Sequence, residues 1–239
     1  MSEKKVREEP AQSASPRQWF RLVAVYLSIP LLLLICGGDL GWWQGWLYAF
    51  LIIAAGIGGR IWAEAQHPGL TAERQSIENI QDAKGWDKVL APLMAVSVSY
   101  PLVIVAGLDH RYGLSPVFSV WLNMFGFILV LFGYAFAAWA VAENRFFYSL
   151  VVVQMDRGHV VCDSGPYRYV RHPAYAGNML ALFGFVLALG SIWTLLPVAV
   201  ASVIAVVRTA LEDRALHNEL PGYREYAGHV RYRLVPGVY

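Results

Sequence analysis

The chain has 239 residues, of which 57% are hydrophobic and 15% are charged, and its net charge is +2. This composition excludes a disordered protein, and two cysteines are too few for a disulfide framework. The near-neutral charge gives no indication of a nucleic-acid-binding protein. The charged residues are clustered, so that long stretches of the chain carry none.

Five uncharged stretches account for about half of the chain, at residues 22–38, 40–59, 89–108, 112–142 and 172–207. A helix needs about 20 apolar residues to cross a hydrocarbon core roughly 30 Å thick. The stretches lack the alternation of barrel strands, which is the other structure that can span a bilayer. The sequence therefore predicts an all-α, polytopic membrane bundle of five to six transmembrane helices.

The last stretch has 36 residues and would be roughly 54 Å long as one helix, which is too long for a single crossing. Gly190 and Ser191 near its middle predict a helical hairpin over residues 175–207, with helices at 175–189 and 192–207. The domain organisation that we expect is a disordered cytosolic tail (1–18), four transmembrane helices (19–142) and a C-terminal functional region (143–239).

Lysine and arginine are distributed unequally between the two sides of the predicted membrane. If the helices alternate in direction, 18 of the 19 lie on one side and only Arg111 lies on the other. Cytoplasmic loops carry the excess of such residues, so both termini are predicted to be cytoplasmic. The densest polar segments, 143–175 and 208–239, share that side, which predicts a working face at the cytosolic membrane surface.

Residues 165–177 read Gly-Pro-Tyr-Arg-Tyr-Val-Arg-His-Pro-Ala-Tyr-Ala-Gly. Pro173 suits the first turn of a helix, and the free N–H groups of that helix end attract a carboxylate. Three aromatic side chains offer flat faces for a base or a sulfonium: Tyr167, Tyr169 and Tyr175. The alternative is an aromatic and basic belt that only anchors the next helix at the membrane interface.

A second cluster, Arg208, Glu212 and Asp213, ends the last uncharged stretch. Arg208 and Glu212 are four residues apart on one helix face and are expected to pair. The pair is either an ordinary interfacial ion pair or a ligand site, in which Arg208 anchors an anion and Glu212 holds a cationic or amino group.

In combination, these motifs resemble the isoprenylcysteine carboxyl methyltransferase and phospholipid methyltransferase superfamily, over 85–95 residues from Gln154 to the C-terminus. The resemblance implies a membrane enzyme that binds S-adenosylmethionine in a cytosolic pocket without a Rossmann domain, and that uses no metal. Arg208 would face the substrate and act in catalysis together with Glu212. The implied cofactor contacts are Gln154, His159, Val160, Val161, Cys162, Tyr167, His172, Pro173, Ala174, Tyr175 and Glu212.

The implied reaction is methyl transfer to a lipophilic acceptor in a membrane, most directly the carboxylate of an isoprenylcysteine-like or other isoprenoid or lipid substrate. We expect a multi-pass protein of a bacterial inner membrane. A carboxylate needs no general base and would be oriented by Arg208. Phospholipid N-methylation is the alternative, in which Glu212 or His172 would remove a proton.

A different enzyme class stays open, because the tail ending in Tyr-Arg-Leu-Val-Pro-Gly-Val-Tyr239 also resembles membrane sterol and steroid reductases. Such enzymes use NADPH, whose extra phosphate requires cationic side chains. The candidates for that role are Arg168, Arg171, Arg224, Arg231 and Arg233.

Overall fold

The structure is a computed structural model that describes residues 15–66, 69, 83–155 and 158–239, and its regular elements there are all helical. Five segments are long and apolar enough to cross a membrane, which confirms the predicted all-α membrane bundle. The α-helices are α1 (Pro16–Gly37), α2 (Trp43–Gln66), α5 (Asp87–Ser97), α6 (Tyr100–Tyr112), α7 (Val120–Glu143), α8 (Pro173–Leu189), α9 (Leu195–Glu219) and α10 (Tyr223–His229).

The first helix begins earlier than expected. Residues 1–14 of the predicted disordered tail lie outside the described residues, but residues 16–18 are helical, so the prediction is wrong for them. Ser15 caps the helix, because its hydroxyl accepts the Gln18 N–H and its own N–H donates to the Gln18 side chain. This reciprocal capping fixes the start of α1.

The predicted third helix, residues 89–108, is interrupted between α5 and α6. Pro101 lies in the first turn of α6, has no N–H and cannot continue the helix from α5. The hydroxyl of Ser99 donates to the carbonyl of Ala95 at 2.7 Å and so satisfies one backbone group that the break leaves open. Together the two helices still form one candidate span.

The predicted C-terminal hairpin is present. Helix α8 ends at Gly190, whose φ of 66° suits glycine, and after the short 3₁₀ turn Ile192–Thr194 the chain returns as α9. Helix α9 continues to Glu219, twelve residues beyond the expected end, and therefore carries Arg208 and Glu212 within it.

Helices α7 and α8 pack backbone against backbone. A methyl group on Gly133 would lie 2.5 Å from the carbonyl oxygen of Gly177, and a methyl group on Gly177 would lie equally close to the Gly133 carbonyl. Small residues allow such close approach between membrane helices. The packing fixes the start of α8 relative to the end of α7.

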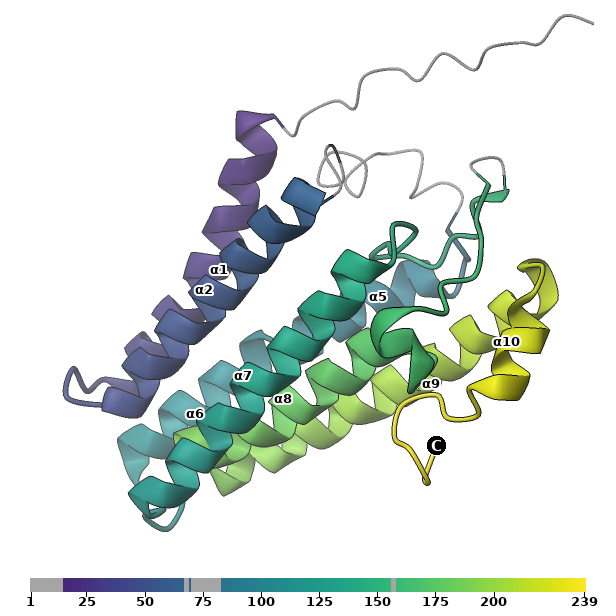
Figure 1. Cartoon of the computed structure of the whole chain (residues 1–239). Coiled ribbons are helices and arrows are strands. Elements are labelled where there is room, and N and C mark those ends of the chain that lie inside the picture. Colours follow the sequence, from purple (N-terminus) through teal and green to yellow (C-terminus); the bar gives the residue numbers. More distant parts are fainter. Residues whose placement is uncertain (1–14, 67–68, 70–82, 156–157) are drawn as a thin grey trace, which may run out of the picture.

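One end of the bundle carries most of the irregular structure. There the segment between α7 and α8, helix α10 and the C-terminal residues gather around the last turns of α9 (Figure 1). Helix α1 begins and α2 ends at the same end, whereas α6, whose last turn contains Arg111, ends at the other (Figure 1). Large apolar side chains remain exposed along the outer helices, including Phe50, Trp121 and Ile128, as expected for surfaces in contact with lipid.

Candidate functional site

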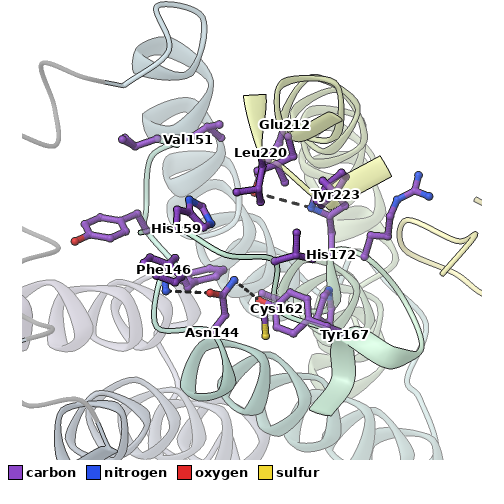
Figure 2. Close-up of a pocket in the computed structure, with 18 of the residues that line it drawn as sticks. Asn144, Phe146, Val151, His159, Cys162, Tyr167, His172, Glu212, Leu220 and Tyr223 are labelled. Atoms are coloured by element: carbon purple, nitrogen blue, oxygen red, sulfur yellow. Dashed lines mark hydrogen bonds and ion pairs between the residues drawn. The ribbon is translucent and has the colours of Figure 1, made fainter. Parts of the chain in front are cut away.

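A cavity lies at this end of the bundle, between residues 144–152, the start of α8, the last turns of α9 and helix α10 (Figure 2). Its volume is about 80 Å³. Most of the predicted cofactor residues line it, although they come from separate parts of the chain. These residues are His159, Val161, Cys162, Tyr167, His172, Pro173, Ala174, Tyr175 and Glu212.

Three predicted residues do not line the cavity: Gln154, Val160 and Arg208. Val160 is 63% exposed and borders an outer groove instead. Gln154 is buried, and its backbone N–H donates to His159 Nδ1 at 3.3 Å while its carbonyl accepts the His159 N–H at 3.1 Å. Gln154 therefore shapes the turn that presents His159, whose ring stacks on Phe146.

Glu212 projects from α9 into the cavity. Its Oε2 accepts the Tyr175 hydroxyl at 2.8 Å, and its Oε1 lies 3.9 Å from His172 Nδ1. Figure 2 shows Glu212 and His172 at the same cavity, with His159 and Phe146 also at its wall. The carboxylate side chain is 23% exposed, so a ligand in the cavity can reach it.

The neighbouring carboxylate, Asp213, has a different environment. It is buried and accepts hydrogen bonds from Arg171 at 2.8 and 3.1 Å, from Arg233 at 2.9 Å and from the Tyr223 hydroxyl at 2.9 Å. His172 Nε2 lies 3.4 Å from its Oδ1. One side chain thus ties together the α8 start, α10 and the C-terminal segment that enclose the cavity.

Arg208 does not pair with Glu212 as expected. Its Nε and Nη2 donate to Oδ1 and Oδ2 of Asp87 at 2.6 and 2.9 Å, and its Nη2 also donates to the Ser149 carbonyl at 2.5 Å. Both side chains are buried, and a bidentate pair with a fully buried carboxylate is more favourable than a partner on the edge of the cavity. The guanidinium carbon lies 5.6 Å from the centre of the Tyr175 ring.

Burial determines the charge of several groups on the cavity wall. It lowers the pKa of His159 below its ordinary value and raises the pKa of the Cys162 thiol and of the Tyr167 hydroxyl. These groups are therefore neutral near pH 7. Arg171 also lines the cavity, but it is bound to Asp213, so Glu212 supplies an acidic group to a largely neutral aromatic wall.

A second, larger cavity of about 450 Å³ lies within the bundle, among α1, α2, α5, α7 and α8. Its lining is mainly apolar. It shares Phe147 and Ala174 with the first cavity, so the two spaces meet at these side chains. We refer to the first as the polar cavity and to the second as the apolar chamber.

A comparison with models of protein families gives a match that covers most of the segments that line the polar cavity. Residues 125–218, which run from α7 to the last turn of α9, match the sequence model of the isoprenylcysteine carboxyl methyltransferase (ICMT) family. This region, which is less than half of the chain, is similar to the ICMT family. No curated protein matches the chain.

The ICMT match confirms the resemblance seen in the sequence, and the family that it names consists of membrane methyltransferases. It includes Arg208, Glu212 and Asp213, but neither α10 nor Asp87. In the part of the chain that the structure describes, no group of three His, Cys, Asp or Glu side chains is placed to hold a metal ion.

Proposed function

We propose that the protein transfers a methyl group from S-adenosylmethionine to a lipophilic acceptor, most directly to a carboxylate of an isoprenoid or lipid molecule. The observation that carries this proposal is the meeting of two unlike spaces at Phe147 and Ala174. One space is polar and contains Glu212, and the other is apolar and lies among the helices. A water-soluble donor and a membrane-soluble acceptor require such a division.

The residues of the polar cavity suit the chemistry of this cofactor. Glu212 matches an amino or sulfonium cation, and the faces of Tyr167 and Tyr175 suit a sulfonium or a base. Ala174 and Tyr175 lie in the first turn of α8, where backbone N–H groups are free for a carboxylate. When bound, S-adenosylmethionine supplies a methyl group on a cationic sulfur.

The size of the polar cavity adds a requirement. Small-molecule sites are typically about 300–1,000 Å³, so a nucleoside-sized ligand needs one wall of the 80 Å³ cavity to move outward. Residues 144–152 form a wall without helix or strand, whereas α8 is fixed against α7 by Gly133 and Gly177. We expect residues 144–148 of this wall to adjust, which hydrogen exchange with and without S-adenosylhomocysteine would detect.

The side chains of this chain would then act by binding and positioning. The apolar chamber holds the tail of the acceptor, and Leu216 and Leu220 exclude water from the polar cavity. A carboxylate acceptor is already ionised and needs no base. Arg208 lies behind Tyr175 and lines neither cavity, so it would orient that carboxylate through the position of the Tyr175 ring. Alignment of the reacting groups supplies much of the rate.

One observation favours an amine as the acceptor instead. The charge of Arg208 is neutralised by Asp87, so an incoming carboxylate meets an ion pair rather than a free cation, while Glu212 remains on the cavity wall. In that case Glu212 or His172 would accept the proton that the amine loses. An S-farnesyl cysteine and phosphatidylethanolamine, each offered with labelled S-adenosylmethionine, distinguish the two classes by which one becomes labelled.

The reductase alternative loses support. Arg171 and Arg233, two of the arginines considered for an NADPH phosphate, are both bound to the buried Asp213. Purified protein in detergent is expected to be stabilised against heat by S-adenosylhomocysteine and not by NADPH. The opposite result would overturn the proposal.

Two substitutions test the proposed roles within the site. Glu212→Ala should abolish binding of S-adenosylhomocysteine, whereas Glu219→Ala is a matched control, because Glu219 lies on the same helix but outside the cavity and bonds to Lys84. Arg208→Lys keeps the charge opposite Asp87 but loses the planar fork. It should keep cofactor binding and lose turnover.

We also propose that the polar cavity faces the cytoplasm, on the basis of the unequal distribution of lysine and arginine. Both termini would then be cytoplasmic. Cysteines introduced at Arg111 and at Glu225 test this orientation in intact cells, because only the first should react with a membrane-impermeant maleimide. Labelling of the second alone would reverse the assignment.

A further inference from the structure

A buried carboxylate outside the family-matched region bonds to Arg208 and to a residue of the polar cavity wall. Asp87 is the first residue of α5 and is fully buried. Its two oxygens accept three hydrogen bonds, two from Arg208 and one from the Val151 N–H at 2.6 Å. A carboxylate is almost never buried unless it is paired, and these three hydrogen bonds offset part of the cost of its desolvation.

The same carboxylate also holds the wall between the two cavities. The Val151 carbonyl accepts the Lys84 N–H at 3.2 Å, so Val151 is bound through both its N–H and its carbonyl to the turn that begins α5. Arg208 in turn holds the Ser149 carbonyl. Ser149 lines the apolar chamber and Val151 lines the polar cavity, so residues 149–151 form part of the partition between them.

The bonds of Arg208 involve only one edge of its guanidinium group. Asp87 and Ser149 occupy Nε and Nη2, and Nη1 makes no hydrogen bond within the described residues. Nη1 is on the edge turned away from the carboxylate, because a side-on pair uses the Nε and Nη2 edge. Asp87 thus determines how the guanidinium plane is turned behind Tyr175, whose ring lines the polar cavity.

We propose that Asp87 is a positioning residue for methyl transfer, which orients Arg208 and the 149–151 partition together so that the acceptor head group meets the donor in line. The inference rests on the proposed function. The start of α5, a helix outside the family-matched region, would then control how the acceptor is positioned. Cofactor binding depends on Glu212 and the α8 start and is not under this control.

Asp87→Glu tests the proposal, because it keeps the charge opposite Arg208 and therefore the fold, but moves the guanidinium by one methylene. A misplacement of about 1 Å can cost about 100-fold in rate. We expect kcat/KM for the acceptor to fall at least about tenfold, while the dissociation constant of S-adenosylhomocysteine changes less than about threefold. Asp87→Asn should likewise lower kcat/KM for the acceptor without weakening the binding of S-adenosylhomocysteine. If Asp87→Asn does not fold, Asp87→Glu alone tests the proposal.

The matched control is Asp109→Asn. Asp109 is also buried, and its carboxylate accepts bonds from Ser115 and Ser191 at the opposite end of the bundle. This variant should change thermal stability, but it should not lower kcat/KM for the acceptor more than it weakens the binding of S-adenosylhomocysteine.

The acceptor probe is whichever of S-farnesyl cysteine and phosphatidylethanolamine the wild-type protein methylates. If the wild type methylates neither and does not bind S-adenosylhomocysteine, the proposed function fails and this inference fails with it. If the wild type is active but Asp87→Glu keeps kcat/KM within about twofold, only the role of Asp87 is refuted. The same holds if cofactor affinity and acceptor kcat/KM fall by equal factors, because a purely structural role predicts that result.

Discussion

Asp213→Asn and Glu212→Gln convert neighbouring carboxylates into amides of nearly the same size, and the structure predicts opposite outcomes for them. The Asp213 side chain is 2% exposed and accepts hydrogen bonds from Arg171, Arg233 and Tyr223. An amide offers one accepting oxygen instead of two and leaves two arginines facing an uncharged group. Asp213→Asn should therefore weaken the fold around the cavity.

The size of the effect follows from burial. Removing one partner of a buried ion pair costs about 3–5 kcal/mol in the free energy of unfolding. For a chain of this length, each kcal/mol lowers Tm by about 2–4 °C, so Asp213→Asn should melt about 6–20 °C below the wild type. Glu212 is partly exposed, and the glutamine oxygen can still accept the Tyr175 hydroxyl, so Glu212→Gln should cost less than about 1 kcal/mol.

Thermal unfolding in detergent, followed by tryptophan fluorescence with and without S-adenosylhomocysteine, measures both variants. Glu212→Gln should have a nearly unchanged Tm but lose the stabilisation by the ligand. The exposed Asp163 provides a control, since Asp163→Asn should change neither quantity. The reasoning is refuted if Asp213→Asn melts within about 2 °C of the wild type, or if Glu212→Gln is stabilised by the ligand as fully as the wild type.

Three further predictions follow from other contacts. Gly133→Ala places a methyl group 2.5 Å from a backbone oxygen of α8 and should cost about 1–3 kcal/mol by overpacking, whereas Gly58→Ala, with open space around it, should raise Tm slightly; equal Tm values would contradict the close packing. Cys162 lines the polar cavity, and burial raises the pKa of its thiol. In a Cys36→Ser background, maleimide labelling of Cys162 should therefore be slow at pH 7 and slower still with S-adenosylhomocysteine. Fast labelling that the ligand does not affect would be inconsistent with this position. Burial lowers the pKa of His159, so near and below the unfolded value of about 6.5 the unfolded chain binds more protons, and the protein becomes less stable as the pH decreases. When the pH is lowered from 7.5 to 5.5, Tm should therefore fall less in His159→Gln than in the wild type. An equal fall in both proteins would exclude this contribution.

The sequence predicts the fold well because the signal for a membrane helix is local and strong. Uncharged stretches of the right length indicated the spans, and Gly190 indicated the turn of the hairpin. The interruption at Pro101 was not predicted, because proline is also tolerated inside membrane helices. Hydropathy alone cannot distinguish a proline within a continuous helix from one at a break. The start of α1 was missed because the Ser15 cap was read as part of a polar tail.

The residues that line the polar cavity could be grouped from the sequence only where they belong to one motif. Tyr167, His172 and Tyr175 are close in the sequence, and Glu212 belongs to a second local cluster with Arg208 and Asp213. Asp87 could not be paired with Arg208 in the same way, because the two are 121 residues apart and no local spacing connects them. The available signal was a single aspartate at the boundary of an uncharged stretch, where an ionisable residue is costly and is usually retained for a partner or a function.

The break between α5 and α6 has a mechanical consequence. Since no continuous ladder of backbone hydrogen bonds joins Ser97 to Tyr100, the two helices are not one stiff rod, and bending between them costs less than bending an intact helix. Ala95 and Val98, just before and at this hinge, line the apolar chamber, and the other end of α5 begins with Asp87. If the apolar chamber holds the tail of the acceptor as proposed, pressure of the tail on this wall would tilt α5 and shift the carboxylate that holds Arg208.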